Sequence, residues 1–178
     1  MELRVAGYVA ASFLLEREPG RWHTLVALDS DKQPTDFLPR HARSHLCLRF
    51  DDIEEPRPPL VPPTASQVAE AIGFAKEKGE LLVSCRAGRG RSVALAYLIL
   101  FHARGPAEAV AFLDPTRHRP NRRVVELGDA LLDSPGALAA FDDWKAAHAR
   151  VRLSDYYDEM EREFNALEAQ GAANRLCS

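Results

Sequence analysis

One stretch of the sequence decides the fold, and it reads Leu81-Leu82-Val83-Ser84-Cys85-Arg86-Ala87-Gly88-Arg89-Gly90-Arg91-Ser92. Its beginning is an apolar run typical of a buried strand, and the run ends at Cys85. Two glycines then indicate a tight loop. The segment from Val93 to Phe101 is apolar and rich in helix formers, so the whole stretch predicts a strand, a loop and a helix.

A loop of this kind is suited to binding an anion. Backbone N–H groups that begin a helix lie at the positive end of its dipole, and Gly88 and Gly90 allow the backbone to approach a phosphate closely. Arg91 offers a planar fork that can bind two phosphoryl oxygens. The same positive field favours the thiolate form of Cys85, and Ser92 is spaced to donate a hydrogen bond to its sulfur. We therefore expect a nucleophile and an anion site within one loop.

The segment Cys85-x5-Arg91-Ser92 resembles the signature of the cysteine-dependent protein tyrosine and dual-specificity phosphatases, in a small, single-domain, bacterial-type form. The family usually carries His before the cysteine, where this chain has Ser84. The resemblance implies catalysis by Cys85, Arg91 and Ser92, with no cofactor and no metal. It also implies that phosphate is bound by the loop residues Arg86, Ala87, Gly88, Arg89, Gly90 and Arg91.

The resemblance further implies a general-acid aspartate on a loop that follows a strand upstream of the cysteine. The strand predicted at 44–50 runs directly into Asp51 and Asp52. Such an acid is needed because the leaving oxygen must be protonated as the P–O bond breaks. We favour Asp52, since it shares the phase of Leu48 and Phe50. Asp51 remains the alternative, because a one-residue slip reverses which carboxylate faces the pocket.

The composition of the whole chain narrows its class. At 178 residues, with 46% hydrophobic and 28% charged residues, it is about one domain with a proper core. A formal net charge of −3 argues against a nucleic-acid partner. We expect no membrane span, because no apolar run is long enough. The first residues do not resemble an export signal, and three widely spaced cysteines do not indicate a disulfide framework, so we expect a cytoplasmic location.

The alternation of strands and helices predicts an α/β fold with a central, mainly parallel sheet of about four strands flanked by helices, as in dual-specificity phosphatases. The strands are predicted within 3–13, at 23–28, at 44–50 and at 81–85. We expect a catalytic domain at 1–150 and a helical extension and tail at 151–178. The extension has apolar residues at helical spacing, namely Tyr156, Met160, Phe164 and Leu167. We expect this helix to pack back on the domain, and a homodimer contact is the alternative.

The sequence therefore favours a phosphoric monoester hydrolase that acts on phosphorylated protein or another phosphomonoester. Arg86 and Arg89 leave open a phosphoinositide or inositol phosphate phosphatase, and Ser84 leaves open a phosphate-binding module with weak catalysis. An inert glycine-rich turn is disfavoured, because burying its arginines without an anion would be costly. For Cys47, we expect a buried strand residue, with a redox partner of Cys85 as the alternative.

Overall fold

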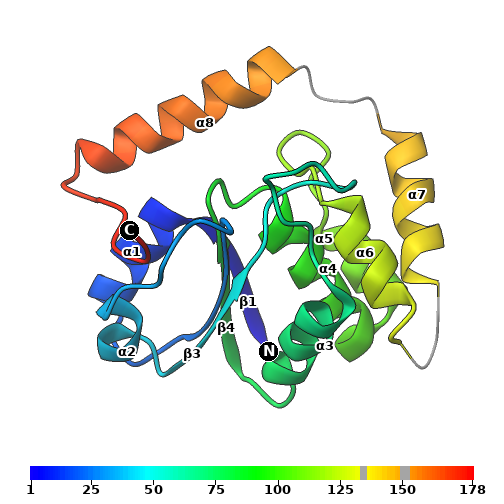
Figure 1. Cartoon of the computed structure of the whole chain (residues 1–178), viewed down its shortest axis with the longest axis horizontal. Helices are drawn as coiled ribbons and strands as arrows, with labels where there is room; N and C mark the ends of the chain where they lie inside the picture. The colour runs from blue at the N-terminus through cyan, green and yellow to red at the C-terminus, as the bar shows by residue number, and fades with distance from the viewer. Residues whose placement is uncertain (133–135, 149–152) are drawn as a thin grey trace.

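The computed structural model describes residues 1–132, 136–148 and 153–178, with side chains from 157 onward in the last segment. Twelve elements occur in the described residues (Figure 1). The strands are β1 (Glu2–Gly7), β2 (His23–Leu28), β3 (Ser44–Arg49) and β4 (Glu80–Cys85). The helices are α1 (Tyr8–Arg17), α2 (Phe37–His41), α3 (Ala65–Ala75), α4 (Arg91–Arg104), α5 (Pro106–Phe112), α6 (Arg122–Asp129), α7 (Ala137–Ala147) and α8 (Leu153–Glu168).

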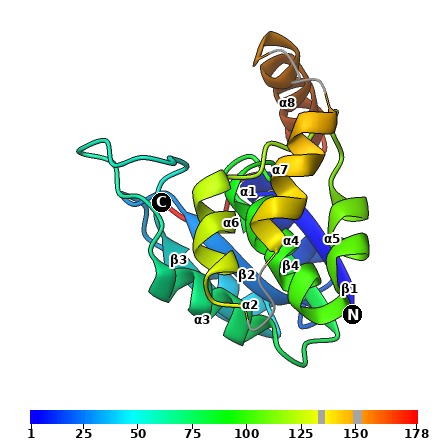
Figure 2. The ribbon, with the colours of Figure 1, turned by 90° about the vertical axis from the view of Figure 1, so that its right-hand side faces the viewer.

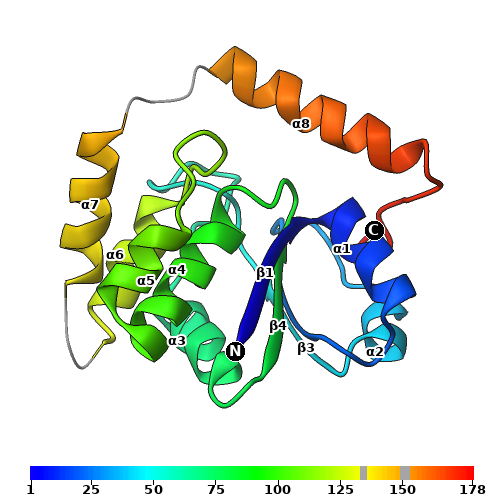
Figure 3. The same ribbon diagram turned by 180° about the vertical axis from the view of Figure 1, so that it is seen from behind.

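The four strands form one parallel sheet in the order β1-β4-β2-β3. Helices cover both faces, which gives the α/β architecture that the alternation of elements predicts (Figure 3). The larger core lies between the sheet and α3, α4 and α6, and a second core lies under α1 and α2 on the opposite face. Helix α4 is buried continuously from Arg91 to Leu100, as expected for a helix in the middle of a core.

The register of the sheet places the end of the central strand β4 between its neighbours. Cys85 pairs with Gly7 of β1 on one side and with Ala27 of β2 on the other. β4 is buried from Leu81 to Cys85, because helices cover both faces of the sheet there. Open parallel sheets bind ligands at the carboxyl ends of their strands, so Cys85 lies where a site is expected.

Helix α1 is the element that the sequence-based prediction misses. We expected only a strand within 3–13, but β1 ends at Gly7 and α1 begins immediately after it. Its buried residues include Tyr8, Ala11 and Leu15, which are spaced for one helical face. The segment is only ten residues long and follows a strand without a loop. The alternation of apolar residues in β1 therefore hides the change from the strand period to the helix period at Gly7.

Other expected elements are present with small shifts. Helix α3 begins after Thr64, which forms a capping box with Gln67. Between β2 and β3 the chain forms the short helix α2. The expected domain boundary between residues 150 and 151 lies outside the described residues, and so does the side chain of Tyr156.

Helix α8 crosses the carboxyl-end side of the sheet, apart from the helices that cover its faces (Figures 1 and 2). The chain after it returns to the second core, where Leu176 and Cys177 are buried. Gln33 and Ser178 exchange two backbone hydrogen bonds, and the backbone N–H of Arg175 donates to Ser12 Oγ at 3.0 Å. The segment after α8 is therefore an ordered part of the domain.

Candidate active site

Cys85 lies at the base of the loop that joins β4 to α4. Its side chain is buried, and its Sγ lies 3.0 Å from Ser92 Oγ, within hydrogen-bond distance. Ser92 stands in the first turn of α4 and is also buried. The two predicted catalytic residues are thus in direct contact, even though one ends a strand and the other begins a helix.

The loop between them has a backbone that requires glycine. Gly88 has a φ of +70°, and a Cβ there would lie 2.4 Å from the backbone nitrogen of Gly7. No side chain can be accommodated at that distance without moving the backbone. The loop is therefore packed directly against the junction of β1 and α1, and α4 begins at its end. This places the N-terminus of a 14-residue helix beside Cys85.

Arg91 is a buried cation of the site, with 2% of its surface exposed. Its Nη1 donates to the carbonyl oxygen of Phe50 at 2.7 Å, and its Nη2 donates to Asp29 Oδ1 at 2.6 Å. Its Nε is buried and has no acceptor among the described residues. Burial alone would lower the pKa of Arg91, but Cys85 and Asp29, among others, raise it. The guanidinium is therefore held rigidly while one donor is left for a further acceptor.

The two adjacent aspartates have different surroundings. Asp51 is buried, and its carboxylate accepts hydrogen bonds from the backbone N–H and hydroxyl of Ser30 and from the backbone N–H of Val61. Burial alone would raise its pKa, but these hydrogen bonds and the charge of Arg91 lower it. The Asp51 carboxylate therefore connects its own loop to the loops that carry Ser30 and Val61.

Asp52, the residue we favour from the sequence, is exposed and lies against the loop. A Cβ added to Gly90 would come within 2.2 Å of Asp52 Oδ2, so this oxygen lies directly over the glycine. Its other oxygen, Oδ1, accepts a hydrogen bond of 2.8 Å from Asn121 Nδ2. One carboxylate oxygen is therefore fixed, and the other lies at the loop.

Asn121 is a residue of the site to which the sequence assigns no role. It is 3% exposed and caps α6, because its Oδ1 accepts from the backbone N–H of Val124 at 3.1 Å. Its Nδ2 donates to Ile53 O as well as to Asp52. The signal available in the sequence is the Pro120-Asn121 pair at a helix start, which predicts the cap but not its second partner.

Asp29 is a second such residue. It follows β2, the neighbour of β4 in the sheet, so the carboxyl-end rule places it near Cys85 once the strand order is known. The strand order itself is not contained in any local pattern. Its partner in the ion pair is Arg91, at 2.6 Å.

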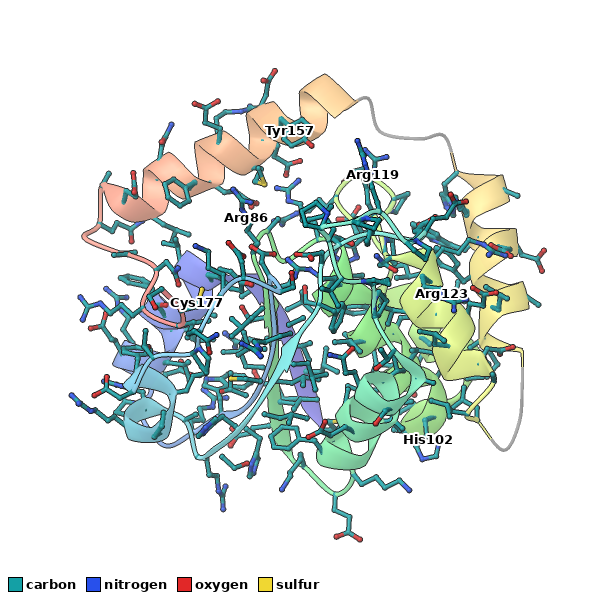
Figure 4. The ribbon with its side chains drawn as sticks, viewed as in Figure 1. Arg86, His102, Arg119, Arg123, Tyr157 and Cys177 are labelled. Atoms are coloured by element: carbon teal, nitrogen blue, oxygen red, sulfur yellow. The ribbon has the colours of Figure 1, made fainter. Side chains whose placement is uncertain are left out.

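The remaining predicted loop residues are Arg86, Ala87 and Arg89. Arg86 is exposed and Ala87 is half-buried, whereas Arg89 is 2% exposed. Arg86 and Arg119 lie on the side of the domain that faces α8 (Figure 4). The guanidinium of Arg89 contacts two glutamates of α8, which the sequence gives no means of pairing with the loop.

The cysteines are all free. Cys47 lies on β3, which is separated from β4 by β2, and it packs against the second core. Cys85 belongs to the first core on the other face. The alternative that Cys47 acts as a redox partner of Cys85 is therefore wrong, because the sheet itself lies between them. Cys47 is half-buried in the sheet, and burial raises the pKa of its thiol to about 11.

No protein-family model matches the chain, and no curated protein matches it. Among solved structures, the phosphatase PTP-2 from Cydia pomonella superposes with a TM-score of 0.51 at 18% identity, over 71% of this chain and 83% of that one. The chain shares the fold of that phosphatase. The Yvh1 phosphatase domain from Chaetomium thermophilum gives a TM-score of 0.44 at 17% identity, over 82% of this chain and 90% of that one. At 18% identity, the match to PTP-2 establishes the fold alone.

The described residues show neither a metal site nor a membrane-spanning helix. They contain no group of three or more His, Cys, Asp or Glu side chains arranged to hold a metal ion. Within the same residues, no helix combines the length and the apolar character needed to cross a membrane.

Proposed function

We propose that the protein is a phosphoric monoester hydrolase of the protein tyrosine and dual-specificity type, acting through a phosphocysteine intermediate. The observation that carries the proposal is the buried Arg91 Nε, a donor without an acceptor among the described residues, in the side chain that also couples electrostatically to Cys85. A buried, unsatisfied guanidinium donor beside a nucleophile is suited to a phosphoryl oxygen. The fold shared with a phosphatase supports the same reading.

The first chemical step uses Cys85 and Asp52. The thiolate attacks phosphorus, an S–P bond forms, and the bond from phosphorus to the leaving oxygen breaks. Asp52, in its protonated form, gives its proton to that oxygen, and Asn121 orients the carboxyl group for this transfer. Arg91 and the loop N–H groups stabilise the charge on the three equatorial oxygens.

The second step regenerates the enzyme. Water attacks the phosphocysteine, Asp52 accepts the proton of the water, and the S–P bond breaks to release inorganic phosphate. Ser92 Oγ, at 3.0 Å from the sulfur, donates a hydrogen bond to the departing thiolate. This residue therefore acts mainly on hydrolysis of the intermediate. No step requires a metal ion or a cofactor.

The test is hydrolysis of an aryl phosphate in the presence of a chelator, for the wild type and for Cys85→Ser. The proposal expects metal-independent turnover that the substitution abolishes while the thermal midpoint stays the same. Asp52→Asn should slow an alkyl phosphate, which has a poor leaving group, by about 10²–10⁴-fold, the usual range for a general acid. A Cys85→Ser protein with full activity would show that the nucleophile lies elsewhere.

A further inference from the structure

Two glutamates of α8 contact Arg89 of the loop between β4 and α4. Glu159 and Glu163 are one helical turn apart, so they project from the same face of α8. Glu159 Oε2 lies 3.3 Å from Arg89 Nη1, and Glu163 Oε2 lies 3.0 Å from Arg89 Nη2. Each end nitrogen of this guanidinium therefore has its own carboxylate.

The same carboxylates also contact a second arginine. Arg117, which follows α5, lies with its Nε 3.7 Å from Glu159 Oε1, and its Nη2 is in contact with Glu163 Oε1. Each glutamate thus uses one oxygen for Arg89 and the other for Arg117. Among the described residues, two positive and two negative charges thus form a four-charge network that joins the loop, the segment after α5, and α8.

Burial makes this network more than a surface ion pair. Arg89 has a side chain that is 2% exposed, whereas Glu159 and Glu163 are 35% and 43% exposed. Burial alone would lower the pKa of Arg89, but Glu163 and Glu159 raise it. A buried charge requires a partner. The carboxylates of α8 therefore occupy the positions at Arg89 that a second anionic group of a ligand would otherwise occupy.

Among the described residues, the hydrogen-bond partners of Arg91 lie outside α8. Arg91 is bonded to Phe50 and Asp29, and its Nε remains available. A single phosphate can therefore bind at Arg91 and the loop N–H groups without disturbing the four-charge network. A polyanion that also binds Arg89 or Arg117 must displace two carboxylates. It then remains close to those negative charges, which repel it.

We propose that Glu159 and Glu163 are specificity-determining residues, which restrict the site to phosphomonoesters with no second anionic group near the loop. This inference rests on the proposed function. It also separates the two substrate classes that Arg86 and Arg89 leave open in the sequence, since the α8 carboxylates select against inositol polyphosphates and phosphoinositides.

The experiment compares binding of a probe with one phosphate group and a probe with six. Inorganic phosphate and inositol hexakisphosphate are titrated by calorimetry at fixed ionic strength into the wild type and Glu159→Gln/Glu163→Gln. The matched control is Glu161→Gln/Glu168→Gln, which removes the same charge from two exposed positions of the same helix. Glutamine keeps the size and helix propensity of glutamate, and thermal midpoints verify folding.

The double variant at 159 and 163 should bind inositol hexakisphosphate at least tenfold more tightly than the wild type, which is about 1.4 kcal/mol. Its affinity for phosphate should change less than threefold, and the control should change less than threefold for both probes. Each single substitution should give an intermediate gain. Equal gains for both probes, the same gain in the control, or no gain would overturn the proposal.

Failure of the specificity role and failure of the proposed function have separate signatures. Binding needs no turnover, so the titrations are repeated in a Cys85→Ser background, and hydrolysis of an aryl phosphate is measured independently. Selectively tighter binding of inositol hexakisphosphate without aryl phosphate hydrolysis would support the role of Glu159 and Glu163 and refute the proposed hydrolase activity. Aryl phosphate hydrolysis without selectively tighter binding of inositol hexakisphosphate would support the proposed hydrolase activity and refute the role of Glu159 and Glu163.

Discussion

Asn121 both caps α6 and donates a hydrogen bond to Asp52, the proposed general acid. Two substitutions at this position should separate these two roles. Asn121→Ala removes the α6 cap, a loss of about 1 kcal/mol, and the hydrogen bonds to Asp52 and Ile53, a further loss of about 1 kcal/mol. We expect unfolding free energy to fall by about 2 kcal/mol at every pH. Asn121→Asp keeps the acceptor for Val124 but places a carboxylate where the amide donated at 2.8 Å.

The Asn121→Asp protein should therefore have a pH-dependent defect. Two carboxylates in contact raise the pKa of one of them above its unfolded value. The folded state then binds more protons, so stability is regained as pH falls through the raised pKa. Urea unfolding should show a loss of about 2–3 kcal/mol at pH 8 that shrinks below about 1 kcal/mol at pH 5.

The reasoning would be refuted by parallel pH profiles for the two variants, because the contact with Asp52 would then contribute nothing. Hydrolysis provides a second measurement on the same proteins. Asn121→Ala should slow an alkyl phosphate about 10–100-fold and an aryl phosphate only a few-fold, since only the poor leaving group depends on an oriented acid. Equal slowing of both esters would indicate general damage to the loop.

Three other substitutions test the surroundings of the site. Gly88→Ala should destabilise the protein by more than about 2 kcal/mol in thermal unfolding and abolish hydrolysis, because its φ of +70° and a Cβ at 2.4 Å from Gly7 N require the backbone to move; a normal midpoint would contradict this. Asp51→Asn should cost about 1–3 kcal/mol at pH 7. Because the pKa of Asp51 is lowered by folding, its contribution is present above the ordinary carboxyl pKa and lost as pH falls through the folded value, so the two denaturation curves should converge in acid. Burial lowers the pKa of His118, whose Nδ1 accepts from the backbone N–H of Asp114, so stability should fall as pH drops from about 6.5 through the folded pKa. His118→Gln should flatten that slope, and an unchanged slope would assign it to other groups.

The strand, loop and helix around Cys85 were predictable because the signals are local. An apolar run, two glycines and a further apolar segment each specify their own conformation, and the contact of Cys85 with Ser92 follows from the short loop. The start of α6 at Asn121 was predictable for the same reason. Alternation of strands and helices was enough for a parallel sheet of four strands.

Features that depend on nonlocal contacts were not predictable. Periodicity cannot distinguish Asp51 from Asp52, because they differ by one residue; the partners Ser30 and Asn121, from distant segments, separate them. Helix α8 meets the loop through Glu159 and Glu163, whereas Phe164 of its apolar stripe is 43% exposed. The stripe predicted the helix, and its residues Met160 and Leu167 are half-buried, but no apolar pattern indicates that α8 also contacts the loop through ion pairs.

Both ends of α8 are connected through the chain to the rest of the domain. Helix α7 precedes α8, and the segment that follows α8 packs into the second core through Leu176 and Cys177. Contact between α8 and the loop is therefore intramolecular. For short tethers the effective concentration is on the order of millimolar. A soluble anion with the same intrinsic affinity for Arg89 must exceed that effective concentration to displace the carboxylates, whatever the concentration of the protein. Occupancy of the network is thus a property of one molecule, and dilution leaves it unchanged.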